Sequence, residues 1–318
     1  MSFTEIVLVL APVFGLLALG WGAAALRILP APVGDALGAF AATVSLPTLL
    51  FNALATAHFP DLSPWPFWGA YFSGVVVAWV AGDICYRRFF GGDPRLGVVA
   101  GVSAAFSNTA MLTIPVVFSV WGKAGDVPIL LLLSVHTPLM TIVATLLFEH
   151  HEAKAEARAF SPLALMRRMV INILKNPIVI GILAGAVVRT LQIPIEGPFR
   201  EVVHRLADTT VPVALFALGM SLKRYGIGGH LVPSSMLVLL KLMVMPAVVF
   251  FMSRHVFTMP PIWSAVATVS AASATGVNAY LIANRAGVGM GLASNTITLS
   301  TAAAALTLGL WLAIIGLP

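Results

Sequence analysis

Two clusters of hydrogen-bonding and helix-breaking residues lie inside long apolar stretches that carry no charge. The first cluster consists of Ser107, Asn108, Thr109, Thr113 and Pro115, and the second consists of Ser273, Thr275, Gly276 and Asn278. Amide and hydroxyl groups can bond a polar solute or satisfy the backbone of an interrupted helix. Proline and glycine are the residues that interrupt helices. The residue types of both clusters therefore favour binding of a polar ligand at a helix break.

Lys241 is the one charge well inside an apolar stretch. A lysine at membrane depth costs roughly 2.5–3.5 kcal/mol on insertion scales, which makes it a functional candidate. It could attract a carboxylate, neutralise a helix C-terminus, or pair with an acid, for which Asp83 and Asp208 are the candidates. The alternative is a structural lysine that bonds backbone carbonyl groups.

Catalytic and cofactor motifs are missing from the sequence. There is no nucleophile–base arrangement and no phosphate-binding loop, and "EHHEAKAEA" (149–157) fails the HExxH zinc motif because Ala155 stands where the second histidine is needed. We therefore expect neither an enzyme nor an ATP-driven pump, with no cofactor and no bound metal. His136 is predicted to be a packed core histidine.

The composition of the chain indicates that these residues lie in a lipid bilayer. Of 318 residues, 59% are hydrophobic and 9% are charged, against roughly 25% charged in soluble domains. The chain is predicted to be an all-α polytopic protein of the lipid bilayer. Ten transmembrane helices are expected, at about 5–28, 34–57, 66–88, 96–120, 127–148, 171–192, 200–222, 231–253, 261–283 and 291–316.

The distribution of Lys and Arg predicts the orientation. Twelve fall on one side of the predicted spans and five on the other, with Lys241 inside a span. The richer side is expected to be cytoplasmic. Both termini are then extracytoplasmic, the loop 149–170 is cytoplasmic, and the location is the inner (plasma) membrane. On this interpretation the net charge of +6 marks the membrane side and does not indicate nucleic-acid binding.

An internal repeat divides the chain. With an offset of 165 residues, Pro12, Gly20, Pro47, Leu50 and Phe51 fall on Pro177, Gly185, Pro212, Leu215 and Phe216. An offset of 170 pairs "SAAFSN" (103–108) with "SATGVN" (273–278). We predict a first five-helix repeat at 1–148, the loop at 149–170 and a second five-helix repeat at 171–318. Because five is odd, the second repeat enters the membrane inverted.

Inverted repeats predict where the site lies. In such transporters, interrupted helices of the two halves meet near the midplane. Spans four and nine carry the two polar clusters, so we expect these broken helices to cross there. Their half-helix N-termini would direct partial positive charge toward a common point, which suits an anion. The alternative is that the polar residues only join helices.

Five motifs carry a resemblance to a known family. They are "SLPTLLFNAL" (45–54), "KNPIVIGILAGAV" (175–187), "ALFALGMSL" (214–222), "LKLMVMP" (240–246) and "GVNAYLIANRAG" (276–287). Together they resemble the auxin efflux carrier family, which includes plant PIN-type carriers and bacterial malonate or malate permeases. The resemblance implies a transport domain with crossed spans four and nine. It also implies a scaffold of spans one, two, six and seven. As a partner we expect a second copy of the chain, bound through these scaffold helices.

The expected function follows from the repeat and the resemblance. It is secondary transport of a small organic anion, a carboxylate, by alternating access, driven by a proton gradient, a sodium gradient or the membrane potential. Ala110 and Thr113 stand where many relatives have small glycines, which leaves the substrate open. The alternatives are a sodium-dependent symporter of the bile-acid type and a non-transporting membrane receptor or channel.

Overall fold

The computed structural model describes residues 3–57, 62–155, 167, 171, 173–225 and 228–316. Within these residues the chain is all-helical, and the only extended pairing is one isolated antiparallel bridge between Ser107 and Thr275. The N-terminal helices are α1 (Phe3–Ala25), α2 (Ala31–Phe40), η1 (Ala41–Ser45), α3 (Leu46–Thr56), α4 (Trp65–Phe90), α5 (Pro94–Ala105), η2 (Thr109–Thr113), α6 (Ile114–Trp121), η3 (Gly122–Gly125) and α7 (Asp126–Ala155).

The C-terminal half is also helical and contains interrupted helices. Its helices are α9 (Pro177–Thr190), α10 (Gly197–Asp208), α11 (Thr210–Tyr225), α12 (Leu231–Leu239), η4 (Leu240–Val244), α13 (Met245–Phe251), η5 (Met252–Val256), α14 (Pro261–Ala272), α15 (Asn278–Arg285) and α16 (Met290–Ile315). Of the predicted loop 149–170, the beginning is the last part of α7, and residues 156–166 and 168–170 lie outside the described residues.

Seven stretches of the described chain are long and apolar enough to cross a membrane by length and composition. They are Thr4–Ala25, Ala31–Thr56, Trp65–Phe90, Thr109–Lys154, Gly197–Lys223, Leu231–Val256 and Met290–Ile315. The difference from ten predicted spans lies at 96–120, 171–192 and 261–283, where the helices are interrupted or shorter. The chain is a multi-pass membrane protein.

Prolines explain the widened turns in three helices. The π-helical segments η1, η2 and η4 each end two residues before a proline, which is Pro47, Pro115 and Pro246 respectively. A proline ring clashes with the carbonyl group four residues earlier and supplies no N–H group. A turn with i→i+5 bonding lets the helix continue past that obstacle.

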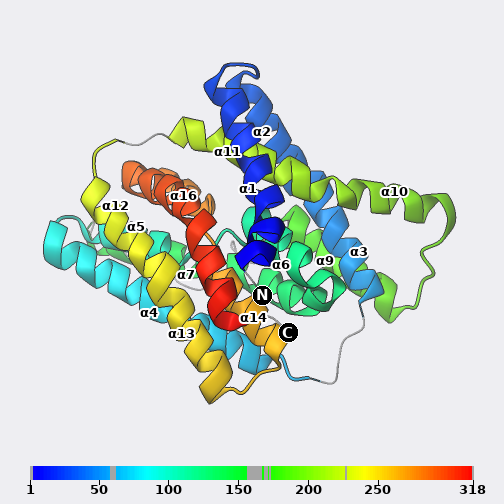
Figure 1. Cartoon of the computed structure of the whole chain (residues 1–318). Helices are drawn as coiled ribbons and strands as arrows, with labels where there is room; N and C mark the ends of the chain where they lie inside the picture. The colour runs from blue at the N-terminus through cyan, green and yellow to red at the C-terminus, as the bar shows by residue number, and fades with distance from the viewer. Residues whose placement is uncertain are drawn as a thin grey trace.

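The helices form two groups, which Figure 1 shows at opposite sides of the molecule. In one group α1 packs on α11, α3 packs on α9, and α11 packs on α2. In the other, α4 packs on α5, α13 on α4 and α14, and α12 on α16, while α7 packs on α5 and α15 on α16. The cavity described below lies between α7 and α15 of the second group and the start of α9 of the first.

Glycines allow the helices of the first group to touch backbone to backbone. A Cβ on Gly20 of α1 would lie 2.1 Å from the carbonyl oxygen of Phe216 in α11. A Cβ on Gly185 of α9 would lie 2.7 Å from the carbonyl oxygen of Phe51 in α3. Real Cβ atoms do not approach so closely, so a side chain at either position would force the helices apart.

Candidate functional site

The two predicted helix breaks lie against each other. Helix α5 ends at Ala105 and α14 ends at Ala272, and the chain after each is extended. The N–H of Asn108 donates to the carbonyl oxygen of Ala274 over 2.8 Å, and the N–H of Gly276 donates to that of Phe106 over 2.8 Å. Backbone that has left the helix is therefore satisfied by the opposite break, as buried backbone must be.

The sequence around Asn108 explains how the chain resumes its helix. The side-chain oxygen of Asn108 accepts from the N–H of Met111 over 3.2 Å, which is the bonding of a helix cap. Its backbone carbonyl accepts from the N–H groups of Leu112 and Thr113. Asn108 is only 5% exposed. It therefore starts η2 inside the protein.

Gly276 packs closely against the opposite break. A Cβ at this position would lie 3.0 Å from the carbonyl oxygen of Ser107 and 3.2 Å from the ring of Phe106. A side chain here would make these neighbours move by a few tenths of an ångström. Gly276 thus serves the second break as a packing residue.

The hydroxyl groups of both clusters mainly donate hydrogen bonds to backbone carbonyl oxygens. Thr275 donates from its side chain to the carbonyl oxygen of Ser103 over 2.8 Å, and the Ser273 hydroxyl donates to that of Asn108 over 3.4 Å. The Thr113 hydroxyl donates to the same Asn108 oxygen over 3.3 Å. Thr109 and Pro115 are buried beside them. These residues assemble the paired breaks and are shielded from solvent.

An aromatic layer backs the first break. The hydroxyl of Tyr71 donates to the Ser107 hydroxyl over 3.0 Å. The ring of His136 lies edge-on to Tyr71 and Phe106, with centroid distances of 5.5 Å and 4.9 Å. His136 is fully buried, as predicted for a core histidine.

Lys241 lies at the second break and is fully buried. Its Nζ donates to the carbonyl oxygen of Ala271 and, over 2.7 Å, to that of Ser273. These carbonyls end α14, where the helix dipole places partial negative charge. The two candidate acids are engaged elsewhere, since Asp83 pairs with Arg87 and Asp208 lies 2.8 Å from His204. Of the alternatives left open by the sequence, the contacts match both a structural lysine that bonds backbone carbonyl groups and a lysine that neutralises a helix C-terminus, and they do not match pairing with Asp83 or Asp208.

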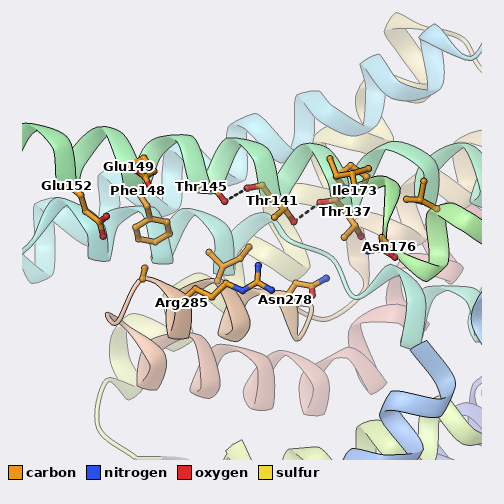
Figure 2. A pocket seen from close by; sticks show the side chains of 14 residues that line it. Thr137, Thr141, Thr145, Phe148, Glu149, Glu152, Ile173, Asn176, Asn278 and Arg285 are labelled. Atoms are coloured by element: carbon orange, nitrogen blue, oxygen red, sulfur yellow. Dashed lines mark hydrogen bonds between the residues drawn. The ribbon is translucent and has the colours of Figure 1, made fainter. Parts of the chain in front are cut away.

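Asn278 differs from the other predicted site residues because it faces a cavity. This cavity has a volume of about 500 Å³. It is lined from α7 by Thr137, Pro138, Thr141, Thr145, Phe148, Glu149 and Glu152, from the segment before α9 and its first turn by Ile173, Asn176 and Val179, and from α15 and the residue after it by Asn278, Ile282, Arg285 and Ala286. Figure 2 shows Asn278 and Arg285 rising from α15 toward the threonines of α7. Neither Asn108 nor Lys241 belongs to the lining.

The cavity has walls of different hydrogen-bonding character. The side chains of Thr141 and Thr145 donate to the carbonyl oxygens of Thr137 and Thr141, over 2.8 Å each, so their protons are already used. On the opposite wall, Arg285 and the amide of Asn278 supply N–H donors. An anion would therefore find its donors on the α15 side.

Arg285 lines the cavity but was not among the site residues predicted from the sequence. In the sequence it counted only among the Lys and Arg residues of the predicted cytoplasmic side. The available signal was its spacing of seven from Asn278, which places both on one face of a helix. That signal has meaning only once 278–285 is known to form a separate helix, α15.

Comparisons with known proteins indicate a membrane transport protein. A sequence family described as "Membrane transport protein" matches residues 5–312. The chain is also 24% identical, over 308 residues, to a protein of Rhizobium meliloti (strain 1021) named "Putative malonate transporter". That alignment covers 93% of this chain and 92% of the relative. Both names describe a transporter and neither describes an enzyme.

Proposed function

Because the chain belongs to this membrane transport protein family, that of the auxin efflux carriers, we propose that it is a secondary transporter of a small organic carboxylate. The name of the Rhizobium meliloti relative supports a dicarboxylate such as malonate as the first substrate to test. The cavity next to the paired helix breaks carries the proposal, because it combines a cation, amide donors and an opening between two helix groups.

The proposed architecture is ten spans in two inverted five-helix repeats. The architecture is supported by a glycine–carbonyl contact that occurs at two places in the structure. Gly20 meets the carbonyl of Phe216, and Gly185 meets that of Phe51, so each glycine and each phenylalanine falls on its repeat mate at the offset of 165. The paired breaks of α5 and α14 supply the second matched feature, since they would be the crossing of spans four and nine.

Alternating access would move one helix group against the other. The cavity is shared between α7 and α15 of one group and the start of α9, which belongs to the proposed scaffold. Hydrogen bonds between the two breaks tie α5 and α14 together, so the wall bearing Asn278 would move as part of one unit. We propose coupling to a proton or sodium gradient or to the membrane potential, with no cofactor, and homodimerisation through the scaffold helices.

Counterflow in proteoliposomes tests the function. Purified full-length protein, reconstituted with internal malonate, should accumulate labelled malonate, and empty liposomes should not. Asn278→Leu should abolish the accumulation, because it removes cavity donors at nearly constant volume. Asn284→Leu on the same short helix is the control, since Asn284 does not line the cavity. Absence of counterflow with malonate and other small carboxylates would overturn the proposal, whereas strict sodium dependence would identify sodium as the coupling ion.

A further inference from the structure

Both ring nitrogens of His136 are buried without a hydrogen-bond partner among the described residues. The side chain is fully buried in α7, inside the apolar stretch Thr109–Lys154. A buried polar atom without a partner costs free energy, so its presence in a native protein requires an explanation other than packing. Ionisable side chains inside membrane spans form proton relays, and histidine is the one that titrates near neutral pH.

Two other titratable side chains act on this ring, and both are engaged. Tyr71 of α4 lies edge-on to it and donates its hydroxyl proton to Ser107 over 3.0 Å. Lys241 of η4 is close enough for its charge to act on the ring, and it donates to two carbonyl oxygens at the end of α14. His136 is therefore the member of this group that can take up or release a proton without breaking a hydrogen bond.

The other helices that pack on α7 bring little charge to the ring. Helices α3, α6 and α14 contain no titratable residue. The titratable residues of the remaining neighbours, α5, α15 and η3, are Arg95, Tyr280, Arg285 and Lys123. On α7 itself the nearest charged residues, Asp126 and Glu149, are at least about 15 Å away along the helix axis. Lys241 is therefore the charge that a proton on His136 has to meet.

His136 connects the first break to the cavity. Its ring lies against Phe106 with a centroid distance of 4.9 Å, and it is near the backbone of Ser107 without a hydrogen bond of normal geometry. The next two residues of α7, Thr137 and Pro138, line the cavity. A charge on His136 would therefore act on an anion in the cavity, and a change at the ring would reach the paired breaks.

The charge of a bound anion decides when His136 can hold a proton. Removal from water disfavours a charged imidazole, and Lys241 adds a like charge nearby. The ring is therefore neutral without an anion. A carboxylate in the cavity supplies the opposite charge and favours the imidazolium, and by linkage a proton on His136 favours the anion by the same factor.

We infer that His136 binds the proton that crosses the membrane together with the carboxylate. A ring nitrogen takes the proton from water on the side where the anion enters, and the proton leaves to water on the other side with the anion. Full burial keeps the ring from exchanging protons unless the helices move, which prevents a leak. The inference rests on the proposed carboxylate transport and selects the proton from the driving forces left open there.

Accumulation driven by a pH gradient tests the inference. Proteoliposomes of purified full-length protein are given an alkaline lumen and a mildly acidic medium, without sodium, and valinomycin with equal potassium holds the membrane potential at zero. Wild type should accumulate labelled malonate and acidify the lumen more than empty liposomes do. His136→Gln should keep malonate counterflow, which needs no net proton movement, but its gradient-driven accumulation should fall about 10-fold or more.

Two comparisons isolate the histidine. His255→Gln removes an exposed histidine of η5 and should accumulate malonate as the wild type does. The acidic medium also raises the share of singly protonated malonate, which would carry its own proton equally in both proteins. The difference between wild type and His136→Gln therefore measures the proton bound by the protein.

The outcomes separate the coupling residue from the transport function. Accumulation by His136→Gln at the wild-type level, or its loss of counterflow, would overturn the inference alone, because the histidine would then be dispensable or structural. Wild-type counterflow without gradient-driven accumulation would overturn it as well. Absence of wild-type counterflow with any small carboxylate would instead overturn the proposed function.

Discussion

Lys241 donates from Nζ to the carbonyl oxygen of Ser273 over 2.7 Å, and it donates a second hydrogen bond to Ala271. The lysine therefore joins η4 to the C-terminal end of α14 next to the paired breaks. The same positive charge would also contribute to the potential around a bound anion. Its structural and electrostatic roles can be separated by mutation.

Lys241→Met should destabilise the protein, because it removes two charged hydrogen bonds and leaves two buried carbonyls unsatisfied. A loss of about 2 kcal/mol is expected, measured as a lower melting temperature in detergent. Lys123→Met changes an exposed lysine and should leave the melting temperature unchanged. A stable Lys241→Met protein that no longer transports would instead place the lysine's main role in the anion path.

The backbone contacts of Gly20 and Gly185 give a prediction for the two packing interfaces. Gly20→Ala and Gly185→Ala should each destabilise the protein by roughly 1–3 kcal/mol, as overpacked sites do. Gly15→Ala lies in the same helix as Gly20 and has no atom within 4 Å of the new Cβ, so it should be neutral. Melting temperatures of the three variants measure the difference, and equal values for Gly15→Ala and Gly20→Ala would contradict the close contact.

The elements that the sequence predicted well depend on local composition. Apolar runs bounded by charge placed the long helices, and the polar clusters with Gly276 placed the two breaks. The end of α7 shows how a membrane span differs from a helix: charged residues lower the hydropathy after 148, so the predicted span ended there, while 149–157 was interpreted as a solvated helix end. Charges four apart are compatible with a helix, which continues to Ala155.

The site was harder to predict because its contacts join distant segments. The residues around Lys241 in the sequence do not indicate that its ammonium group donates hydrogen bonds to carbonyl groups at the end of α14. The cavity exists only where α7, α9 and α15 come together, so the roles of Asn176 and Arg285 depend on tertiary structure. Polar side chains that looked alike in the sequence have different uses: Thr275 holds backbone, whereas Asn278 faces the cavity.

The ends of α7 offer a test of the predicted orientation. Its 30 residues span about 45 Å, which exceeds a hydrocarbon core of roughly 30 Å. In a Cys85→Ser background, Lys123→Cys should react with an impermeant thiol reagent from outside intact cells. Lys154→Cys should react only after the membrane is opened. The reverse pattern would invert the proposed topology.

The hydrogen bonds of Asp93 predict how the stability of the folded protein depends on pH. Its side chain accepts from the N–H of Arg95 over 2.9 Å, which caps α5, and from the Arg95 side chain over 2.8 Å. The hydrogen bond from the Arg95 side chain lowers the pKa of Asp93 below its ordinary value of 3.8. A lowered folded-state pKa means that the stabilisation is complete above the unfolded-state pKa and is lost as the pH falls through the folded-state pKa.

Asp93→Ala should therefore lower the melting temperature near neutral pH, with a loss of about 0.5–2 kcal/mol for the cap. The deficit relative to wild type should shrink as the pH is lowered below about 4. Asp93→Asn keeps the capping oxygen and removes the charge, so its smaller deficit should also disappear on acidification. A deficit that is independent of pH would show that the carboxylate charge adds nothing at this helix end.

Asn108 and Asn278, which the repeat pairs by sequence, should respond differently to the same substitution. Asn108 is buried and its side-chain oxygen caps η2 through Met111, so Asn108→Leu should cost about 1–2 kcal/mol of stability. Asn278 is only partly buried, lines the cavity, and makes no side-chain hydrogen bond to another described residue. Asn278→Leu should therefore keep the wild-type melting temperature while losing carboxylate binding.

Melting curves with and without malonate measure both effects on one sample. Asn108→Leu should melt at a lower temperature yet still gain stability from malonate, because Asn108 does not line the cavity. Asn278→Leu should melt as the wild type does and gain nothing. If both variants lose the malonate shift without a change in the ligand-free melting temperature, the two asparagines bind the substrate together at the breaks, and the cavity on α15 is not where the carboxylate is held.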